Sequence, residues 1–180
     1  MKKPNQRVTL TKRILKESLI NLLKNNSIHK ISIRELCDNA GINRSTFYNN
    51  YGNQYDLLAD IENELLLDLQ KIISAPFQAT EEDNASQLVV VFEYLLNNRE
   101  LALLLINNNI DPEFPEKLIS LPLVQNSLSN YIISRNYPEE ALPYISNFII
   151  YGAYNMIREW LNKQNCSTEE IAKLLINLIY

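Results

Sequence analysis

The sequence contains very little glycine, histidine and cysteine. Its three glycines, Gly41, Gly52 and Gly152, are too scattered to form the glycine-rich loop that holds phosphate groups in nucleotide-binding proteins. The single histidine, His29, lies in a short polar connector, where a solvated residue is more common than the general base of a catalytic triad. One histidine also excludes a multi-histidine metal site. We therefore expect no enzymatic activity, no metal site and no cofactor.

The composition is that of a globular protein without an export or membrane segment. Hydrophobic residues make up 46% of the chain and charged residues 21%, which is far from the pattern of disordered sequences. The longest uninterrupted aliphatic run, Leu101 to Ile106, is too short to span a membrane. Cys37 and Cys166 have neither metal-ligand spacing nor the density of a disulfide framework. We expect a cytoplasmic protein with no membrane partner.

Charge is distributed unevenly along the chain, whose net charge is only -4. Residues 1–56 contain ten lysines and arginines and four acidic residues, whereas the rest of the chain contains seven basic and seventeen acidic residues. A basic segment attracts the phosphate backbone of nucleic acid, and an acidic segment is repelled by it. The alternative is a chance distribution of surface charge. We predict a basic domain at 1–56 and an acidic domain at 57–180.

Helical patterns dominate the chain, and no strand-like alternation of useful length occurs. Leucines at spacings of three and four predict a first helix that Thr11 can cap: Leu15, Leu19, Leu22 and Leu23. A second helix follows at Ser32, which has capping-box spacing to Glu35. This second helix carries one narrow apolar stripe, formed by Ile33, Leu36, Cys37 and Ala40.

Gly41 is expected to end the second helix, since glycine tolerates the positive φ that is common after a helix C-terminus. Asn43 can cap a third helix over residues 44–50, in which Phe47 is the core residue. Two short helices joined by a tight glycine turn form a helix-turn-helix. The side chains left free on the third helix form hydrogen bonds readily: Arg44, Ser45, Thr46, Tyr48 and Asn49.

Asn53 can cap a long amphipathic helix that leads into the second domain through Leu57, Leu58, Ile61, Leu65, Leu69 and Ile72. Beyond it, the pattern predicts helices near residues 84–98, 99–108, 113–136, 138–164 and 168–180. Pro122 and Pro143 are positions at which the later helices can be kinked or divided. The predicted fold class is all-α.

Residues 11–58 resemble the N-terminal domain of the TetR family of bacterial regulators. The resemblance rests on an ordered set of residues: the turn glycine Gly41, the aromatic pair Phe47 and Tyr48, the further aromatic Tyr51, and Leu57 and Leu58 in the helix that Asn53 caps. It implies a TetR-like fold, in which a three-helix helix-turn-helix domain binds DNA. It also implies a C-terminal helical domain that pairs two subunits and binds a small-molecule ligand.

Two further features bear on affinity and subgroup. Where the family commonly has lysine at the start of the fourth helix, this chain has Gln54, which adds no charge. Phosphate affinity then depends more on the helix N-terminus at Asn53 and on basic residues: Lys2, Lys3, Arg7 and Lys12. Segments 148–152, 157–161 and 167–170 resemble the dimerising end of a subgroup that includes regulators of dihydroxyacetone kinase operons.

The predicted DNA-binding residues are Ser32, Arg34, Asn43, Arg44, Ser45, Thr46, Tyr48, Asn49, Asn53 and Gln54. In a major groove, arginine suits guanine and asparagine suits adenine, which are the roles expected for Arg44 and Asn49. A phosphate contact is favoured for Tyr48 and a partly buried core role for Tyr51, although each residue type is compatible with both. Arg34 is equally compatible with a backbone contact and with a solvated surface position.

The second domain contains aromatic residues at helical spacing that are candidates for lining a ligand pocket: Phe92, Tyr94, Tyr131, Phe148 and Tyr151. For each of them, a place in the core or in an interface is the more common alternative. Gly152 allows two helices to approach closely, which predicts a four-helix bundle between subunits. The candidate interface residues are Gly152, Ile157, Trp160, Leu175 and Leu178.

The function these patterns favour is a ligand-responsive transcriptional repressor that binds a palindromic operator as a homodimer. Its expected partners are double-stranded DNA, a second copy of the chain and an unidentified small-molecule effector. The alternative is a co-activator or adaptor of the same fold that acts mainly through protein contact, to which the acidic second domain and Gln54 lend some support. An enzyme is disfavoured, because no nucleophile and base pair can be assembled.

Overall fold

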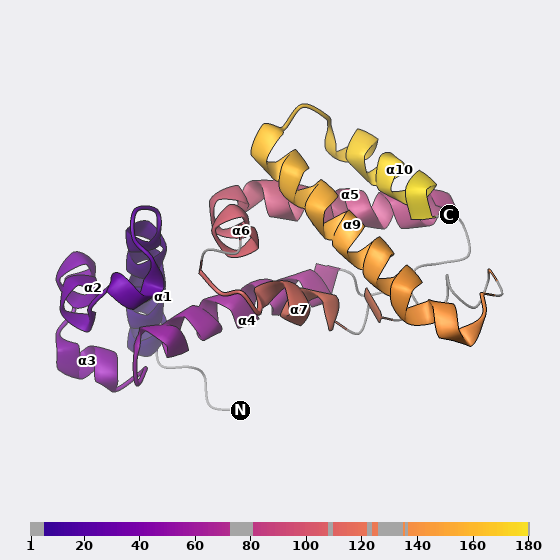
Figure 1. Cartoon of the computed structure of the whole chain (residues 1–180). Coiled ribbons are helices and arrows are strands. Elements are labelled where there is room, and N and C mark those ends of the chain that lie inside the picture. Colours follow the sequence, from indigo (N-terminus) through magenta and orange to yellow (C-terminus); the bar gives the residue numbers. More distant parts are fainter. Residues whose placement is uncertain are drawn as a thin grey trace. The chain divides into compact units, whose positions relative to one another are not determined.

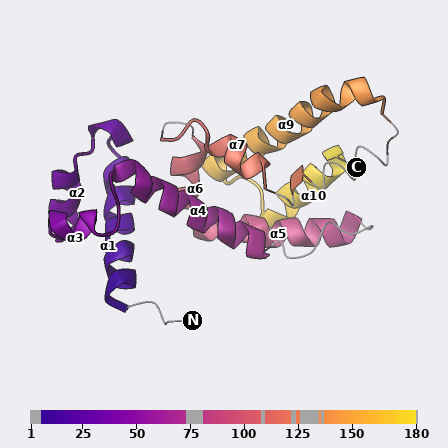
Figure 2. The same cartoon turned by 90° about the horizontal axis from the view of Figure 1, so that it is seen from below.

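A computed structural model describes residues 6–72, 81–107, 110–121, 124–125, 135 and 137–179 (Figures 1 and 2). The regular elements of these residues are α-helices and short 3-10 helices, with no strand among them, so the predicted all-α fold class is confirmed. None of the described helices is both long and apolar enough to cross a membrane. The chain divides into two compact units, Met1–Leu65 and Leu66–Tyr180.

The first unit begins with α1 (Gln6–Leu23), the 3-10 helix η1 (Ile28–Lys30), α2 (Ile33–Ala40) and α3 (Arg44–Tyr48). It ends within α4 (Gln54–Ile72), which crosses the boundary between the units. α1 packs on α2, and α2 packs on α3. The core consists of side chains with no solvent exposure: Leu15, Leu19, Leu36, Phe47 and Leu57. The unit boundary falls after Leu65, later in the chain than the domain limit at residue 56 that charge suggested.

The first helix begins earlier than the sequence predicts. α1 starts at Gln6, so Thr11 lies inside the helix and is not its cap, and the prediction for Thr11 was wrong. Residues 6–10 contain neither glycine nor proline, so nothing in them stops the helix from extending toward the N-terminus. The added turns expose Val8 and Leu10.

The two turns of the helix-turn-helix form largely as predicted. The Ser32 hydroxyl accepts a hydrogen bond from the backbone N–H of Glu35 (3.1 Å), so Ser32 caps α2. Gly41 ends α2 with φ of 65°, and the N–H of Ile42 donates to the carbonyl of Cys37 (3.0 Å). Asn43 occupies the N-cap position of α3, but its side chain forms no hydrogen bond to that helix.

The start of α4 is fixed by a reciprocal pair of contacts. Asn53 Oδ1 accepts hydrogen bonds from the N–H groups of Tyr55 (2.8 Å) and Asp56 (3.0 Å), which confirms the predicted cap. Asp56 Oδ2 in turn accepts from the N–H of Gly52 (2.9 Å). A Cβ at Gly52 would lie 2.7 Å from that oxygen, so a side chain at this position would displace the Asp56 carboxylate.

The second unit continues with α5 (Glu81–Asn97), α6 (Arg99–Ile106) and α7 (Phe114–Ile119). After residues that lie partly outside the described ones, it resumes with the 3-10 helix η2 (Glu139–Ala141), α9 (Leu142–Lys163) and α10 (Thr168–Ile179). α10 lies along α5, and α9 packs on α6 (Figure 1). Rings of Phe92 and Trp160 meet in its core, with centroids 5.2 Å apart.

The helix predicted over 113–136 is not continuous, and it is interrupted close to Pro122, one of the two positions named above as places where a helix can be divided. α7 ends at Ile119, and Leu121 lies in a bend. Proline at position 122 disfavours helical backbone at the preceding residue, which accounts for the early end. Most of the remaining part of the predicted helix lies outside the described residues. Pro143, by contrast, lies in the first turn of α9, where its missing N–H costs nothing.

Side-chain hydrogen bonds to helix ends join α6 to α9. The Arg99 guanidinium donates to the carbonyls of Leu161 (2.8 Å) and Asn162 (3.2 Å), which lie near the C-terminus of α9. The Tyr154 hydroxyl donates to the carbonyl of Ile106 (2.5 Å), the last residue of α6. These contacts satisfy carbonyls that a helix C-terminus leaves without an intrahelical donor.

The positive φ of Gly41 leads to a stability prediction. Replacement by alanine should lower the free energy of unfolding by roughly 1–2 kcal/mol, because a Cβ disfavours left-handed backbone, although space for that Cβ exists. Asparagine at the same position is the matched control and should cost less, since it adopts this conformation more readily. Urea denaturation followed by circular dichroism measures both. Equal losses for Gly41→Ala and Gly41→Asn would contradict the prediction.

Candidate nucleic-acid interface

The ten predicted DNA-binding residues all lie in the first unit, between positions 32 and 54. Their arrangement depends on α3, whose five residues turn Phe47 into the core with no solvent exposure. In an α-helix a residue two positions away lies about 200° around the axis, so Ser45 points to the side opposite Phe47. Asn43, Arg44 and Ser45 are exposed, whereas Thr46 is half-buried. α3 therefore presents one face to the core and the other to solvent.

Arg44 is the first residue of α3 and lies on its exposed face. Among the residues that the structure describes, it has no ion-pair partner, and its side chain is exposed. Two other arginines of the first unit differ in this respect: Arg34 pairs with Asp38 (Nε–Oδ2, 3.6 Å) and Arg13 with Glu17 (Nε–Oε1, 3.7 Å). A guanidinium without a carboxylate partner keeps its donors available for an external acceptor.

The C-terminal end of α3 is held by local contacts. Tyr48 is 58% exposed, and its ring meets the edge of Phe47 at a centroid distance of 5.5 Å. The amide nitrogen of Asn50 donates to the carbonyl of Thr46 (2.8 Å), and Asn49 is an exposed residue at the C-cap. Tyr48 and Asn49 thus present polar groups to solvent on a framework that Phe47 anchors.

The flanking candidates lie at the starts of two helices. Ser32 and Arg34 are exposed at the beginning of α2. Asn53 is exposed, and its side-chain oxygen is used in the α4 cap, which leaves its NH2 group as a donor. Gln54 is half-buried as the first residue of α4. A helix N-terminus together with side-chain donors suits an anionic ligand such as phosphate.

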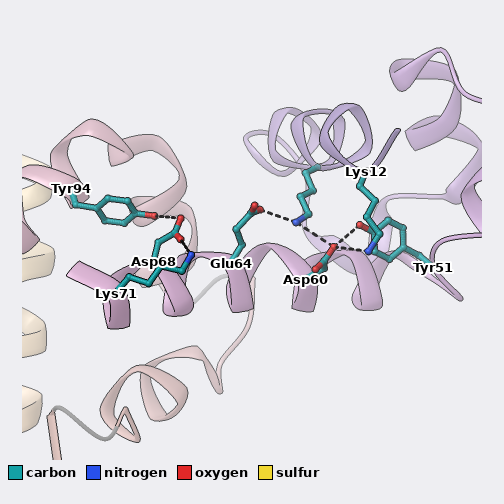
Figure 3. Close-up of polar contacts among 8 residues, drawn as sticks. Lys12, Tyr51, Asp60, Glu64, Asp68, Lys71 and Tyr94 are labelled. Atoms are coloured by element: carbon teal, nitrogen blue, oxygen red, sulfur yellow. Dashed lines mark hydrogen bonds and ion pairs between the residues drawn. The ribbon is translucent and has the colours of Figure 1, made fainter. Parts of the chain in front are cut away.

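The sequence analysis missed a polar cluster that joins Tyr51, which follows α3, to side chains of α1 and α4. Asp60 Oδ2 accepts a hydrogen bond from the Tyr51 hydroxyl (2.6 Å) and pairs with the ammonium groups of Lys12 (3.5 Å) and Lys16 (3.2 Å) (Figure 3). Lys16 also contacts Glu64 (2.8 Å). The spacing of these residues in the sequence could have indicated the cluster. Lys12 and Lys16 are four residues apart, and so are Asp60 and Glu64, so each pair shares one face of its helix.

This cluster changes the expectation for Lys12. Its ammonium lies 5.0 Å from the centre of the Tyr51 ring and pairs with Asp60, so it already has an internal counter-charge. Of the other basic residues expected to contribute phosphate affinity, Arg7 is exposed, and Lys2 and Lys3 lie outside the described residues. Tyr51 is 6% exposed, in agreement with the buried alternative for this residue.

Ionisation in the cluster follows from its contacts. Burial opposes the charge of Asp60, but hydrogen bonds from Tyr51 and Lys16 and the charges of Lys16 and Lys12 outweigh it, so the pKa of Asp60 lies below its usual value. Burial, followed by the hydrogen bond to Asp60, raises the pKa of Tyr51 far above its usual value. At neutral pH the cluster therefore contains a carboxylate and a protonated phenol.

The candidates for a ligand pocket that the structure describes lie in different surroundings within the second unit. Phe92 is fully buried against Trp160, and Tyr94 is half-buried with its hydroxyl bonded to Asp68 (3.3 Å). Phe148 and Tyr151 are exposed on α9, and Tyr131 lies outside the described residues. The ligand pocket stays a prediction.

The candidates for a subunit interface divide into two groups. Trp160 and Leu175 are buried within their own unit, and the Trp160 indole N–H donates to the carbonyl of Cys166 (2.9 Å). Gly152 and Leu178 are exposed, and Ile157 is half-buried. Large exposed apolar side chains gather on the same two helices: Tyr144, Phe148, Tyr151, Leu174 and Leu178. The interface also stays a prediction.

The chain is similar to known proteins in both units. Residues 82–180, more than half of the chain, match the TetR family model described as "Transcriptional regulator C-terminal region". Over 56 residues, 31% of this chain, it is 38% identical to the HTH-type dhaKLM operon transcriptional activator DhaS of Lactococcus lactis subsp. lactis (strain IL1403). That match spans only 30% of the length of the activator.

Solved structures of regulators have a similar fold. A TetR transcriptional regulator from Streptococcus agalactiae 2603V is 20% identical with a TM-score of 0.69, over 97% of this chain and 96% of that one. The dihydroxyacetone kinase operon activator DhaS is 22% identical with a TM-score of 0.58, over 95% and 94%. FadR from Bacillus subtilis, in complex with stearoyl-CoA, is 16% identical with a TM-score of 0.65, over 93% and 96%.

The family match covers the second unit, while the helix-turn-helix lies in the first, so the two lines of evidence come from different parts of the chain. The relatives also include the dihydroxyacetone kinase operon regulators that the sequence analysis named as a similar subgroup. The chain belongs to the TetR family of transcriptional regulators.

Proposed function

We propose that this regulator binds a palindromic DNA operator as a homodimer and changes its affinity for that operator when a small molecule binds to the second unit. The observation that carries the proposal is the division of α3, which buries Phe47 and exposes Arg44, Ser45 and Tyr48. A helix of this kind, following a tight turn after another helix, is the element that enters a major groove.

The exposed side chains are suited to different parts of a duplex. The unpaired fork of Arg44 matches the two acceptors of guanine, and the amide of Asn49 matches adenine. Ser45 lies between them on the outward face, available for a base or a phosphate. Tyr48 and the NH2 group of Asn53 are the donors that we assign to phosphates, where they set register without reading sequence.

A second copy of the chain is the partner proposed for α9 and α10. Tyr144, Phe148 and Tyr151 recur at spacings of four and three along α9, and Leu174 and Leu178 at a spacing of four along α10, so each helix has an exposed apolar row. Two antiparallel helix pairs related by a two-fold axis would bury these rows against each other. The same axis would place two recognition helices on successive turns of DNA, about 34–36 Å apart.

Response to an effector is proposed for the second unit. The family model for the C-terminal region covers it, and one regulator of similar fold has a bound stearoyl-CoA. A ligand changes DNA affinity only if it binds the two conformations of the dimer unequally. We propose repression as the direction of regulation, as the sequence analysis expected, although two relatives are named activators.

The competing function is an adaptor that acts through protein contact. The half-buried, uncharged Gln54 and the internal pairing of Lys12 and Lys16 favour it, because they leave fewer cations for phosphate. Salt separates the two functions, since binding through several phosphates weakens steeply with salt concentration. A separate experiment distinguishes repression from activation. A reporter gene is fused to a promoter whose DNA the protein binds, and its expression is measured with and without the regulator.

The first prediction concerns DNA recognition. Genomic fragments retained by the purified protein at near-physiological salt should share a short inverted repeat. Arg44→Ala should lower affinity for that repeat by about 5- to 150-fold, because a bidentate arginine contributes about 1–3 kcal/mol of discrimination, and adding Tyr48→Ala should abolish specific binding. Arg13→Ala is the matched control, since Arg13 is an exposed arginine of the same unit that pairs with Glu17. Unchanged specific binding in the double variant would contradict the assignment.

The second prediction concerns assembly. Phe148→Asp combined with Leu178→Asp should convert the dimer to a monomer, because both side chains are largely exposed (81% and 69%) and burying unpaired charges of the same sign in an apolar interface is costly. Leu10→Asp, at an exposed leucine of the first unit, is the control and should leave the dimer intact. Sedimentation equilibrium measures the mass. A dimer that persists in the double variant argues against the proposed face.

The third prediction concerns the effector. Trp160 is the only tryptophan, and it lies in the core of the second unit against Phe92, so its emission reports on that unit. Stearoyl-CoA and dihydroxyacetone are the probes that the names of the relatives suggest. One of them should shift Trp160 emission and lower operator affinity at the same concentration. A shift without any change in affinity would refute effector coupling for that probe.

A further inference from the structure

The proposed recognition helix, α3, is too short to be stable without contacts to other elements. α3 has five residues, whereas isolated helices shorter than about 12–15 residues are marginal in water. Its N-terminal end follows the Gly41 turn, and its middle is anchored by Phe47. Its C-terminal end therefore needs an anchor of its own, because one buried ring leaves rotation about that ring unopposed.

Tyr51 supplies that anchor. Its N–H donates to the carbonyl of Phe47 (2.9 Å), which closes the turn that follows α3. Its ring packs against the ring of Phe47, with centroids 5.9 Å apart. Its hydroxyl donates to Asp60 Oδ2 (2.6 Å), so the residue is tied at both ends, to α3 through its backbone and to α4 through its phenol.

Asp60 in turn joins three segments at one oxygen atom. The same Oδ2 accepts from Tyr51 and lies within ion-pair distance of Lys12 and Lys16 of α1 (Figure 3). The Lys12 ammonium also lies over the Tyr51 ring. Because both lysines lie on α1, any shift of the phenol relative to α1 or α4 breaks at least one of these contacts.

We propose that Asp60 is a positioning residue for DNA recognition, which through the Tyr51 hydroxyl holds the C-terminal end of α3 against α1 and α4. The proposal rests on the proposed function, since it assigns a role in that same binding event. The hydroxyl of Tyr51 is then an internal group and not a phosphate ligand. Lys12 and Lys16 serve the same internal contact.

Loss of the hydrogen bond between Tyr51 and Asp60 should affect DNA affinity differently from loss of a phosphate contact. A misplaced α3 loses base contacts, so specific affinity falls, whereas the number of phosphates neutralised, and with it the salt dependence, stays the same. A lost phosphate contact weakens specific and non-specific binding together. The ratio of specific to non-specific affinity is therefore the decisive quantity, and overall stability does not change that ratio in a folded protein.

The test is Tyr51→Phe in the full-length protein, with binding measured on the operator fragment and on unrelated DNA at several salt concentrations. We expect about a tenfold loss of specific affinity, non-specific affinity within about twofold of wild type, and an unchanged salt slope. Asp60→Asn keeps an oxygen for the phenol and should lose less specific affinity than Asp60→Ala. Circular dichroism and urea denaturation verify folding, and Tyr51→Phe decides the question if Asp60→Ala fails to fold.

Tyr154→Phe is the matched control. Tyr154 also donates its hydroxyl to an internal acceptor, the carbonyl of Ile106, but in the second unit. Operator affinity of this variant should equal that of wild type in the absence of effector.

Equal specific affinity of wild type and Tyr51→Phe would overturn the positioning role alone. Equal loss on both DNAs with a shallower salt slope would assign Tyr51 to phosphate. Absence of any specific DNA in the wild type would overturn the proposed function, and the positioning role with it.

Discussion

The proposed recognition helix, α3, has five residues and too few internal hydrogen bonds to be stable alone, so the residues that surround it set its position. Phe47 provides the hydrophobic part of that support and Tyr51 the polar part. The polar part ends on one oxygen of Asp60, where two lysines of α1 also meet. The exposed face of α3 is therefore an outcome of contacts made on its hidden side, by residues that we do not place on DNA.

The same contacts explain how a basic domain uses its charge. Lys12 and Lys16 face carboxylates of α4, and Arg13 and Arg34 each pair with an acid four residues later. Much of the positive charge counted in the sequence thus has an internal partner. We therefore propose that DNA affinity depends more on Arg44, on neutral donors and on the helix start at Asn53 than a count of basic residues suggests. Such contacts supply orientation and base discrimination more than bulk attraction.

In the second unit, α9 and α10 each have one apolar face buried in the core of the unit and another that is exposed. Trp160 on α9 and Leu175 on α10 are buried within the unit, while Phe148 and Leu178 on the same helices are exposed. The sequence analysis grouped all of them as interface or pocket candidates, because an apolar residue at helical spacing has the same pattern whether it faces its own core or another chain. Only the packing of α9 and α10 with α5 and α6 separates the two groups.

The sequence by itself determined the local features, because they depend on neighbouring residues: the all-α class, the Ser32 and Asn53 caps, the Gly41 turn and the burial of Phe47. It failed at the start of α1, which lies before Thr11. Over 113–136 it predicted one helix and named Pro122 as a place where that helix can be divided, without deciding between the two. Tertiary structure alone decided that Tyr51 donates to Asp60 and that Lys12 has an internal partner. These residues lie 9 to 48 positions apart, and no local rule relates them until tertiary packing brings Lys12 of α1 and Tyr51 into contact with Asp60 of α4.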